Sequence, residues 1–114
     1  MYEKLRITIL LLTLSGCAIW PLGEDPTGKE YRAQAELLVM AIINYKEMNG
    51  ALPPSLDALT PKYIQELPEI KNNIFYSHEE ESLNYDYTPS WPQAGRTSCY
   101  TVIGSGKWDC HGYI

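Results

Sequence analysis

TGKEYRAQAELLVMAIINYKEMNG, residues 27–50, has the spacing of one long amphipathic helix. Apolar side chains recur three or four residues apart and form a wide stripe, at Ala35, Leu38, Ile42 and Tyr45, flanked by Leu37, Ala41 and Met48. The polar residues fall mostly outside that stripe, at Arg32, Gln34, Glu36, Lys46 and Glu47. We therefore expect a helix over about 28–48 that packs one face against a core.

Both ends of this helix carry sequence signals. Thr27-Gly28-Lys29-Glu30 has the Thr-x-x-Glu form of a capping box, in which a hydroxyl and a carboxylate satisfy free N–H groups at a helix start. Asn49-Gly50 is a favourable left-handed stop. The preceding residues 18–26 mix proline, glycine and acidic residues, and we expect little fixed structure there.

The rest of the chain predicts a small antiparallel sheet. Residues 52–59 and 60–64 favour two short helical turns, started by Ser55 and by Thr60-Pro61. Residues 73–77 and 83–87 alternate as strands around the acidic turn 78–82, and residues 98–112 form a last hairpin. The expected fold is α+β: one long N-terminal helix packed on a small antiparallel β-meander, with a disulfide-linked C-terminal hairpin.

The N-terminus has the layout of a targeting segment. Lys4 and Arg6 precede an apolar segment, residues 7–14, that is too short to span about 30 Å of hydrocarbon. Leu14-Ser15-Gly16-Cys17 then resembles the lipobox of a bacterial lipoprotein signal. The resemblance implies a cleaved signal peptide over 1–16, acylation of Cys17, a lipidated tether over 17–26 and one domain over 27–114. The alternative is an ordinary secretory signal with an incidental Cys17.

The same resemblance implies a location. Because Ala18 follows the cysteine, where retained inner-membrane lipoproteins often carry Asp, we expect the bacterial envelope, lipid-anchored in the outer membrane and facing the periplasm. Without residues 1–16 the chain keeps 98 residues, with seven of its nine Lys/Arg and 13 of its 14 Asp/Glu, a formal charge of −6. That acidic balance excludes nucleic acid as a partner, since nucleic-acid binding needs clustered Lys and Arg.

Two cysteines remain for pairing in an oxidising compartment, Cys99 and Cys110. Gly104-Ser105 is a favourable two-residue hairpin loop, and it sets a register in which the numbers of facing residues sum to 209, so that Cys99 faces Cys110. This register places one set of residues inward, Cys99, Thr101, Ile103, Trp108 and Cys110, and the other outward, Tyr100, Val102, Lys107, Asp109 and His111. We expect a disulfide; the alternative is two reduced thiols.

A helix with an Asn-Gly stop, a Pro-Ser-Leu turn and a Pro-x-Tyr segment follow one another, at 41–50, 52–59 with Pro53-Pro54-Ser55-Leu56, Pro61-Lys62-Tyr63-Ile64 and Leu67-Pro68. With this layout, residues 31–68 resemble the head of type IV pilin-like and type II secretion pseudopilin-like proteins. The polymerising stem is absent, because the apolar segment lies before Cys17 and Pro21 stands fifth from it. The resemblance therefore implies the head fold without filament assembly. Calcium binding does not transfer either, because loop 88–98 has no carboxylate.

No catalytic motif includes the two histidines, His78 and His111, and we expect no enzyme, no metal and no cofactor. The aromatic residues suggest partner binding through Trp91, Tyr87 and Tyr85. The leading hypothesis is a lipid-anchored, non-enzymatic protein-binding or assembly component with an envelope protein partner. The alternative is an immunity-type inhibitor of a toxin or hydrolase, and an envelope hydrolase is a third possibility.

Overall fold

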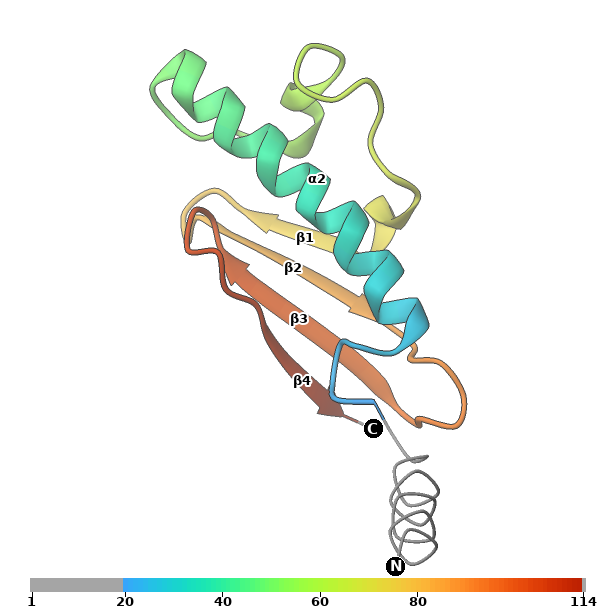
Figure 1. The fold of residues 1–114 in the computed structure, drawn as a ribbon. Helices are drawn as coiled ribbons and strands as arrows, with labels where there is room; N and C mark the ends of the chain where they lie inside the picture. The colour runs from blue at the N-terminus through green and yellow to red at the C-terminus, as the bar shows by residue number, and fades with distance from the viewer. Residues whose placement is uncertain (1–19, 114) are drawn as a thin grey trace, which may run out of the picture.

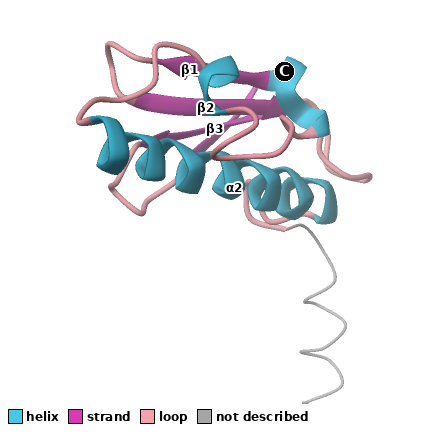
Figure 2. Ribbon diagram, turned by 90° about the horizontal axis from the view of Figure 1, so that it is seen from above, coloured by secondary structure: helices cyan, strands magenta, loops and turns pink. Residues whose placement is uncertain are grey.

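Helix α2 (Pro26–Asn49) lies diagonally across one face of a four-stranded antiparallel sheet. The computed structural model describes residues 20–113. The strands follow one another in space as they do in sequence: β1 (Ile74–Ser77), β2 (Ser82–Tyr87), β3 (Arg96–Val102) and β4 (Asp109–Tyr113). Figure 2 shows the helix and the sheet as two layers. The predicted α+β architecture is confirmed.

The core lies between α2 and the sheet. Fully buried side chains of the helix meet fully buried side chains of the central strands, Ala35, Leu38 and Ile42 against Leu83, Tyr85, Tyr87 and Cys99. The ring of Tyr31 packs on both buried tyrosines, with ring centroids 6.1 Å from Tyr85 and 5.2 Å from Tyr87. The centre of the stripe predicted from helical spacing is therefore the surface that the helix buries, but the prediction is wrong for two flanking residues, because Leu37 and Met48 are 57% and 69% exposed.

The helix stops as predicted but starts differently. Gly50 has φ 80°, and its N–H donates to the carbonyl of Lys46 at 2.8 Å. At the other end the capping-box prediction is wrong, because Asp25 is the N-cap and its carboxylate accepts from the N–H of Gly28 at 3.3 Å. Pro26 takes the first helical position, where a missing N–H costs nothing. The Thr27 hydroxyl instead bonds Ser90 Oγ at 2.8 Å.

Residues 21–25 are ordered against the domain, so the expectation of little fixed structure is wrong for this part of the 17–26 segment. The N–H of Glu24 donates to the carbonyl of Pro21 at 3.0 Å, and Gly23 and Asp25 are buried. Gly23 has φ 83°, and a Cβ there would lie 2.8 Å from Cys110 Sγ. Only glycine allows the chain to pass this close to the hairpin.

Between the helix and β1 the chain forms short 3₁₀ turns, η1 (Leu56–Leu59) and η2 (Glu69–Asn73). Ser55 precedes η1 as predicted, although its side chain makes no capping hydrogen bond. The turn at 60–64 places the Tyr63 ring edge to face with the Tyr45 ring, with the ring centroids 5.2 Å apart. The sequence did not predict η2, which begins directly after Pro68.

The C-terminal hairpin has the predicted register and a different turn. Every β3–β4 pair sums to 209, including Cys99 with Cys110, and the predicted inward residues are buried or half-buried. The turn centre is not Gly104-Ser105, because the N–H of Ser105 donates to Val102, which places Ile103 and Gly104 in the middle. The N–H of Ile103 also donates to the carbonyl of Glu81 at 2.8 Å, so this loop is bonded to the neighbouring turn between β1 and β2.

Candidate functional site

The disulfide joins two directly facing residues in the middle of the last hairpin. The sulfurs of Cys99 and Cys110 are 2.09 Å apart, and their Cα atoms are 4.1 Å apart. The predicted pairing is confirmed. Because Cys99 is fully buried, the bond fixes edge strand β4 to the core.

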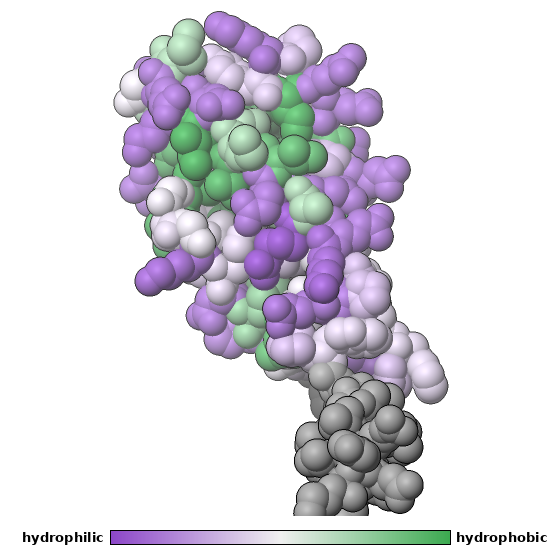
Figure 3. Space-filling model, viewed as in Figure 1, coloured by the Kyte–Doolittle hydropathy of each residue, from purple (hydrophilic) through white to green (hydrophobic). Residues whose placement is uncertain are grey.

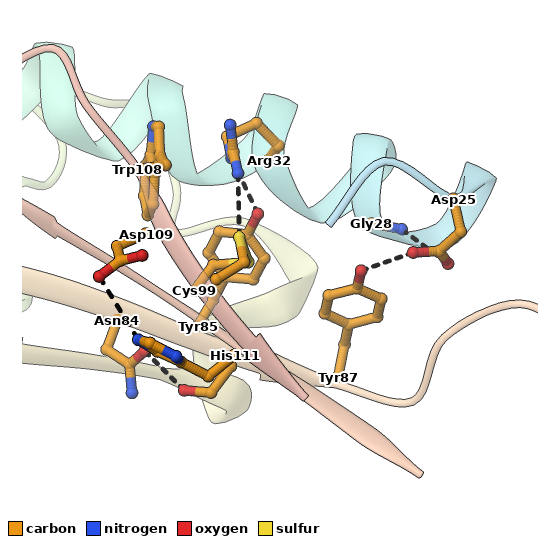
Figure 4. The surroundings of a disulfide bond; sticks show 12 residues. Asp25, Gly28, Arg32, Asn84, Tyr85, Tyr87, Cys99, Trp108, Asp109 and His111 are labelled. Atoms are coloured by element: carbon orange, nitrogen blue, oxygen red, sulfur yellow. Dashed lines mark hydrogen bonds and ion pairs between the residues drawn. A yellow bond between two sulfur atoms is a disulfide. The ribbon is translucent and has the colours of Figure 1, made fainter. Parts of the chain in front are cut away.

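Arg32 lies over this disulfide and connects it to the helix (Figure 4). Its Nε donates to the hydroxyl of Tyr85 at 2.8 Å, and its Nη2 contacts Cys110 Sγ at 3.3 Å. The guanidinium carbon is 4.7 Å from the Trp108 ring centroid, a cation–π distance. Helical spacing placed Arg32 outside the apolar stripe, and only the fold reveals that its head group crosses to the sheet.

Asp25 is the centre of a second buried cluster (Figure 4). Its carboxylate, with no exposed surface, accepts from the Tyr87 hydroxyl at 2.6 Å and from the Ser90 N–H at 2.8 Å, besides the Gly28 N–H. Burial by itself raises the pKa of the Asp25 carboxyl, but the hydrogen bonds from Tyr87, Ser90 and Gly28 outweigh it and hold the pKa below its usual range. The cluster therefore keeps the Asp25 carboxylate charged at the N-terminus of α2, which is the positive end of the helix dipole.

The hydroxyl of Tyr87 stays protonated in this cluster. Burial raises the pKa of the Tyr87 phenol, and the hydrogen bond to Asp25 raises it further. The phenol is thus a permanent donor to the carboxylate at neutral pH. Gly28 lies against the same hydroxyl, and a Cβ at this position would collide with it.

The three residues predicted to bind a partner have different surroundings. Trp91 is 88% exposed on the loop between β2 and β3, whereas Tyr85 and Tyr87 are fully buried under α2. The prediction that Tyr85 and Tyr87 contact a partner is therefore wrong for this fold, because alternation along β2 turns both inward. The role of Trp91 stays a prediction.

The face of the sheet opposite α2 has no covering layer among residues 20–113. It exposes large side chains from three strands, 57% of Phe75, 39% of Tyr100, 43% of Val102 and 49% of Tyr113. Arg96 Nη2 lies 3.4 Å from Asp86 Oδ2 on the same face, and the Tyr113 hydroxyl donates to that carboxylate at 2.9 Å. We call this surface the open sheet face; alternation along β3 had predicted Tyr100 and Val102 outward.

Both histidines lie on the surface. His111 Nε2 is 3.4 Å from Asp109 Oδ2, and both side chains are exposed. Ser98 faces His111 across the strands, but its hydroxyl donates to Asn84 Oδ1 at 3.0 Å. His78 is exposed in the β1–β2 turn. No group of three or more His, Cys, Asp or Glu positioned to hold a metal occurs within residues 20–113.

Comparison of the chain with protein-family models, with curated proteins and with solved structures found no match. The resemblance of residues 31–68 to pilin-like heads stays a prediction. The lipobox and the signal peptide lie outside the described residues. In the part of the chain that the structure describes, no helix has the length and apolar character to cross a bilayer.

Removing the disulfide should destabilise the domain. The Cys99→Ser/Cys110→Ser double variant is expected to lose about 3 kcal/mol of unfolding free energy, because the bond closes a short loop in the unfolded chain and fixes β4. Urea unfolding of the wild-type and variant chains measures the difference. The intact mass of the wild type should also be lower by two hydrogens than that of the reduced chain; two free thiols in the folded protein would contradict the assignment.

Asp25 should confer a stability that disappears in acid. Since its folded pKa is depressed, the contribution is fully present above the unfolded value of about 4 and is lost as pH falls through the folded pKa. Asp25→Asn should cost about 1–3 kcal/mol near pH 7, because a charged acceptor of three hydrogen bonds is lost. The difference in unfolding free energy between Asp25→Asn and wild type should therefore shrink as the pH falls below about 4.

Urea unfolding across this pH range makes the comparison, with Glu24→Gln as the matched control, since Glu24 is the exposed neighbouring carboxylate. The control should stay within about 0.5 kcal/mol of wild type near pH 7. If the loss of unfolding free energy in Asp25→Asn were the same at every pH, the charge of Asp25 would play no part in stability.

Proposed function

We propose that this protein is a lipid-anchored component of the bacterial envelope that binds another envelope protein through the open sheet face and performs no catalysis. The observation that carries the proposal is the exposure of Phe75, Tyr100, Val102 and Tyr113 on one uncovered side of a disulfide-fixed sheet. Rigid aromatic side chains contribute large contact area at small entropic cost, and aromatic residues dominate binding hot spots.

The mixed character of the open sheet face supports a protein partner. Phe75 and Tyr100 flank Asn84 in one row across three strands, and the Asp86–Arg96 ion pair lies nearby. An apolar centre with charged and hydrogen-bonding groups around it is the usual composition of a non-obligate interface. Lipidation at Cys17 supplies the membrane attachment in this proposal, and two or three acyl chains give a durable anchor.

One feature favours the inhibitor alternative. The turn between β1 and β2 exposes three consecutive carboxylates, Glu79, Glu80 and Glu81, of which Glu81 has a weak ion pair at 3.9 Å to Lys46. An acidic tip of this kind would attract a basic toxin surface. Loss of partner binding on a triple Glu→Gln change, with the open sheet face intact, would favour this alternative.

Site-specific photo-crosslinking in intact cells tests the main proposal. A photoreactive residue at position 100 of the full chain should give a discrete adduct with an envelope protein, because Tyr100 is central on the open sheet face. The same residue at Glu66, an exposed position beside Leu37 on the other side of α2, serves as the control. The adduct at position 100 should weaken at least tenfold on Phe75→Asp, which is expected to leave the fold intact since Phe75 is exposed.

Labelling of growing cells with palmitate tests the anchor. Wild-type protein should incorporate the label and Cys17→Ser should not. Equal adducts at positions 100 and 66, or an adduct indifferent to Phe75→Asp, would overturn the binding face; absence of label in the wild type would overturn the anchor.

A further inference from the structure

One end of the domain is almost free of charge, although the chain carries 14 Asp/Glu and nine Lys/Arg. Three segments without Lys, Arg, Asp or Glu meet there, 20–23, 87–95 and 110–113. Figure 1 shows the β2–β3 loop, the end of β4 and the N-terminal side of α2 at this end, opposite the two hairpin turns. We call this surface the uncharged end.

Contacts between the segments hold the uncharged end together. Gln93 Nε2 donates to the carbonyl of Trp20 at 3.4 Å, so the β2–β3 loop contacts the incoming chain. Leu22 lies against β4, where a Cβ added to Gly112 would be 3.1 Å from its methyl group. Ser90 is bound to Asp25, which fixes the base of the loop that carries Trp91. The surface is therefore built by the fold.

Four large aromatic or apolar side chains are exposed at this end, beside the uncharged Thr88 and the neutral His111. Trp91 is 88% exposed, Tyr113 49%, Leu22 43% and Trp20 37%. Figure 3 shows pale side chains of near-neutral hydropathy where the described chain begins. Tryptophan and tyrosine are enriched at the level of lipid headgroups, because each combines an apolar ring with a polar N–H or O–H.

The position of Cys17 in the sequence indicates which surface the uncharged end contacts. Trp20 follows Cys17 by three residues, which span at most about 11 Å when fully extended. Acyl chains on Cys17 would lie in the bilayer, so Trp20 would lie within that distance of the membrane surface, and the uncharged end is the part of the domain beside Trp20. The inference rests on the proposed lipidation at Cys17.

We propose that the uncharged end rests on the lipid bilayer, with Trp91 and Trp20 in the headgroup region and Leu22 and Tyr113 beside them. The charged groups nearby fit this contact, because Arg96 is paired with Asp86, and Glu24 is the single exposed carboxylate of residues 20–25. The strands then stand upright on the membrane. The open sheet face points sideways, where an envelope protein reaches it, and the acidic turn at 78–81 points away.

The contact is apolar in origin. The chain without residues 1–16 has a formal charge of −6 and is not drawn electrostatically to an anionic membrane, and no basic cluster occurs at the uncharged end among residues 20–113. Salt has little effect on membrane binding through aromatic rings, whereas membrane binding through Lys and Arg would weaken steeply as the salt concentration rises. The contact should therefore persist in high salt.

Quenching of tryptophan fluorescence by brominated lipid tests this orientation. The full protein is purified from bacterial membranes and reconstituted in phosphatidylethanolamine and phosphatidylglycerol vesicles with and without brominated acyl chains. Trp91→Phe should remove at least half of the quenched emission, at 50 mM and at 500 mM salt alike. Trp108→Phe is the matched control, because Trp108 is bound to Glu36 away from this end, and it should leave the quenched emission unchanged.

Intact mass of the same sample separates the possible failures. An acylated Cys17 with quenching unaffected by Trp91→Phe overturns the bilayer contact and leaves the lipid anchor standing. A Cys17 without lipid overturns the anchor, and the bilayer contact with it. If Cys17 is acylated, and quenching is lost in Trp91→Phe but not in Trp108→Phe, both the lipid anchor and the bilayer contact are supported.

Discussion

The buried carboxylate of Asp25 is the interaction on which the rest of the structure depends. A carboxylate removed from water is costly unless hydrogen bonds replace its hydration, and here a phenol and two backbone N–H groups do so. Each donor comes from a different part of the chain: Gly28 from the first turn of α2, Tyr87 from the end of β2, and Ser90 from the following loop. One side chain thereby sets where the helix begins, how it is placed on the sheet and where the Trp91 loop is held.

The disulfide and Arg32 extend this constraint to the edge of the sheet. Asp25 positions the first turn of α2, Arg32 lies further along the helix, and its guanidinium reaches Tyr85, Trp108 and Cys110. Gly23 packs against the disulfide just before the cluster. The N-terminal segment is therefore held at two points, against the hairpin at Gly23 and against β2 and its following loop at Asp25. In the proposed function, this rigidity holds the domain in one orientation above a lipid-bearing Cys17.

Local patterns predicted the elements, and long-range contacts decided what the patterns could not. The centre of the helical stripe, the Asn49-Gly50 stop and the Cys99–Cys110 register all depend on residues close in sequence, and all are confirmed. The start of α2 was predicted wrongly at Thr27, because the cap is selected by distant partners: Tyr87 and Ser90, over 60 residues away, bond to Asp25. The inward direction of Tyr85 and Tyr87, the role of Arg32 and the turn at Ile103-Gly104 depend on packing between distant segments in the same way.

Substitution of Gly28 by alanine tests the Asp25 cluster most directly, because two physical effects then have opposite signs. Helix propensity alone predicts that Gly28→Ala stabilises the protein by about 1 kcal/mol. The cluster predicts a loss of at least about 1 kcal/mol, since the new methyl group collides with the Tyr87 hydroxyl and the Asp25 carboxylate and breaks the hydrogen bond between them. The same methyl group would lie 2.6 Å from the Gly23 carbonyl oxygen, so the double variant with Tyr87→Phe separates the part of the loss that belongs to the cluster. Urea unfolding at pH 7 measures the sign. A loss, reduced when Tyr87→Phe is combined with Gly28→Ala, supports the account; a gain in stability would contradict it.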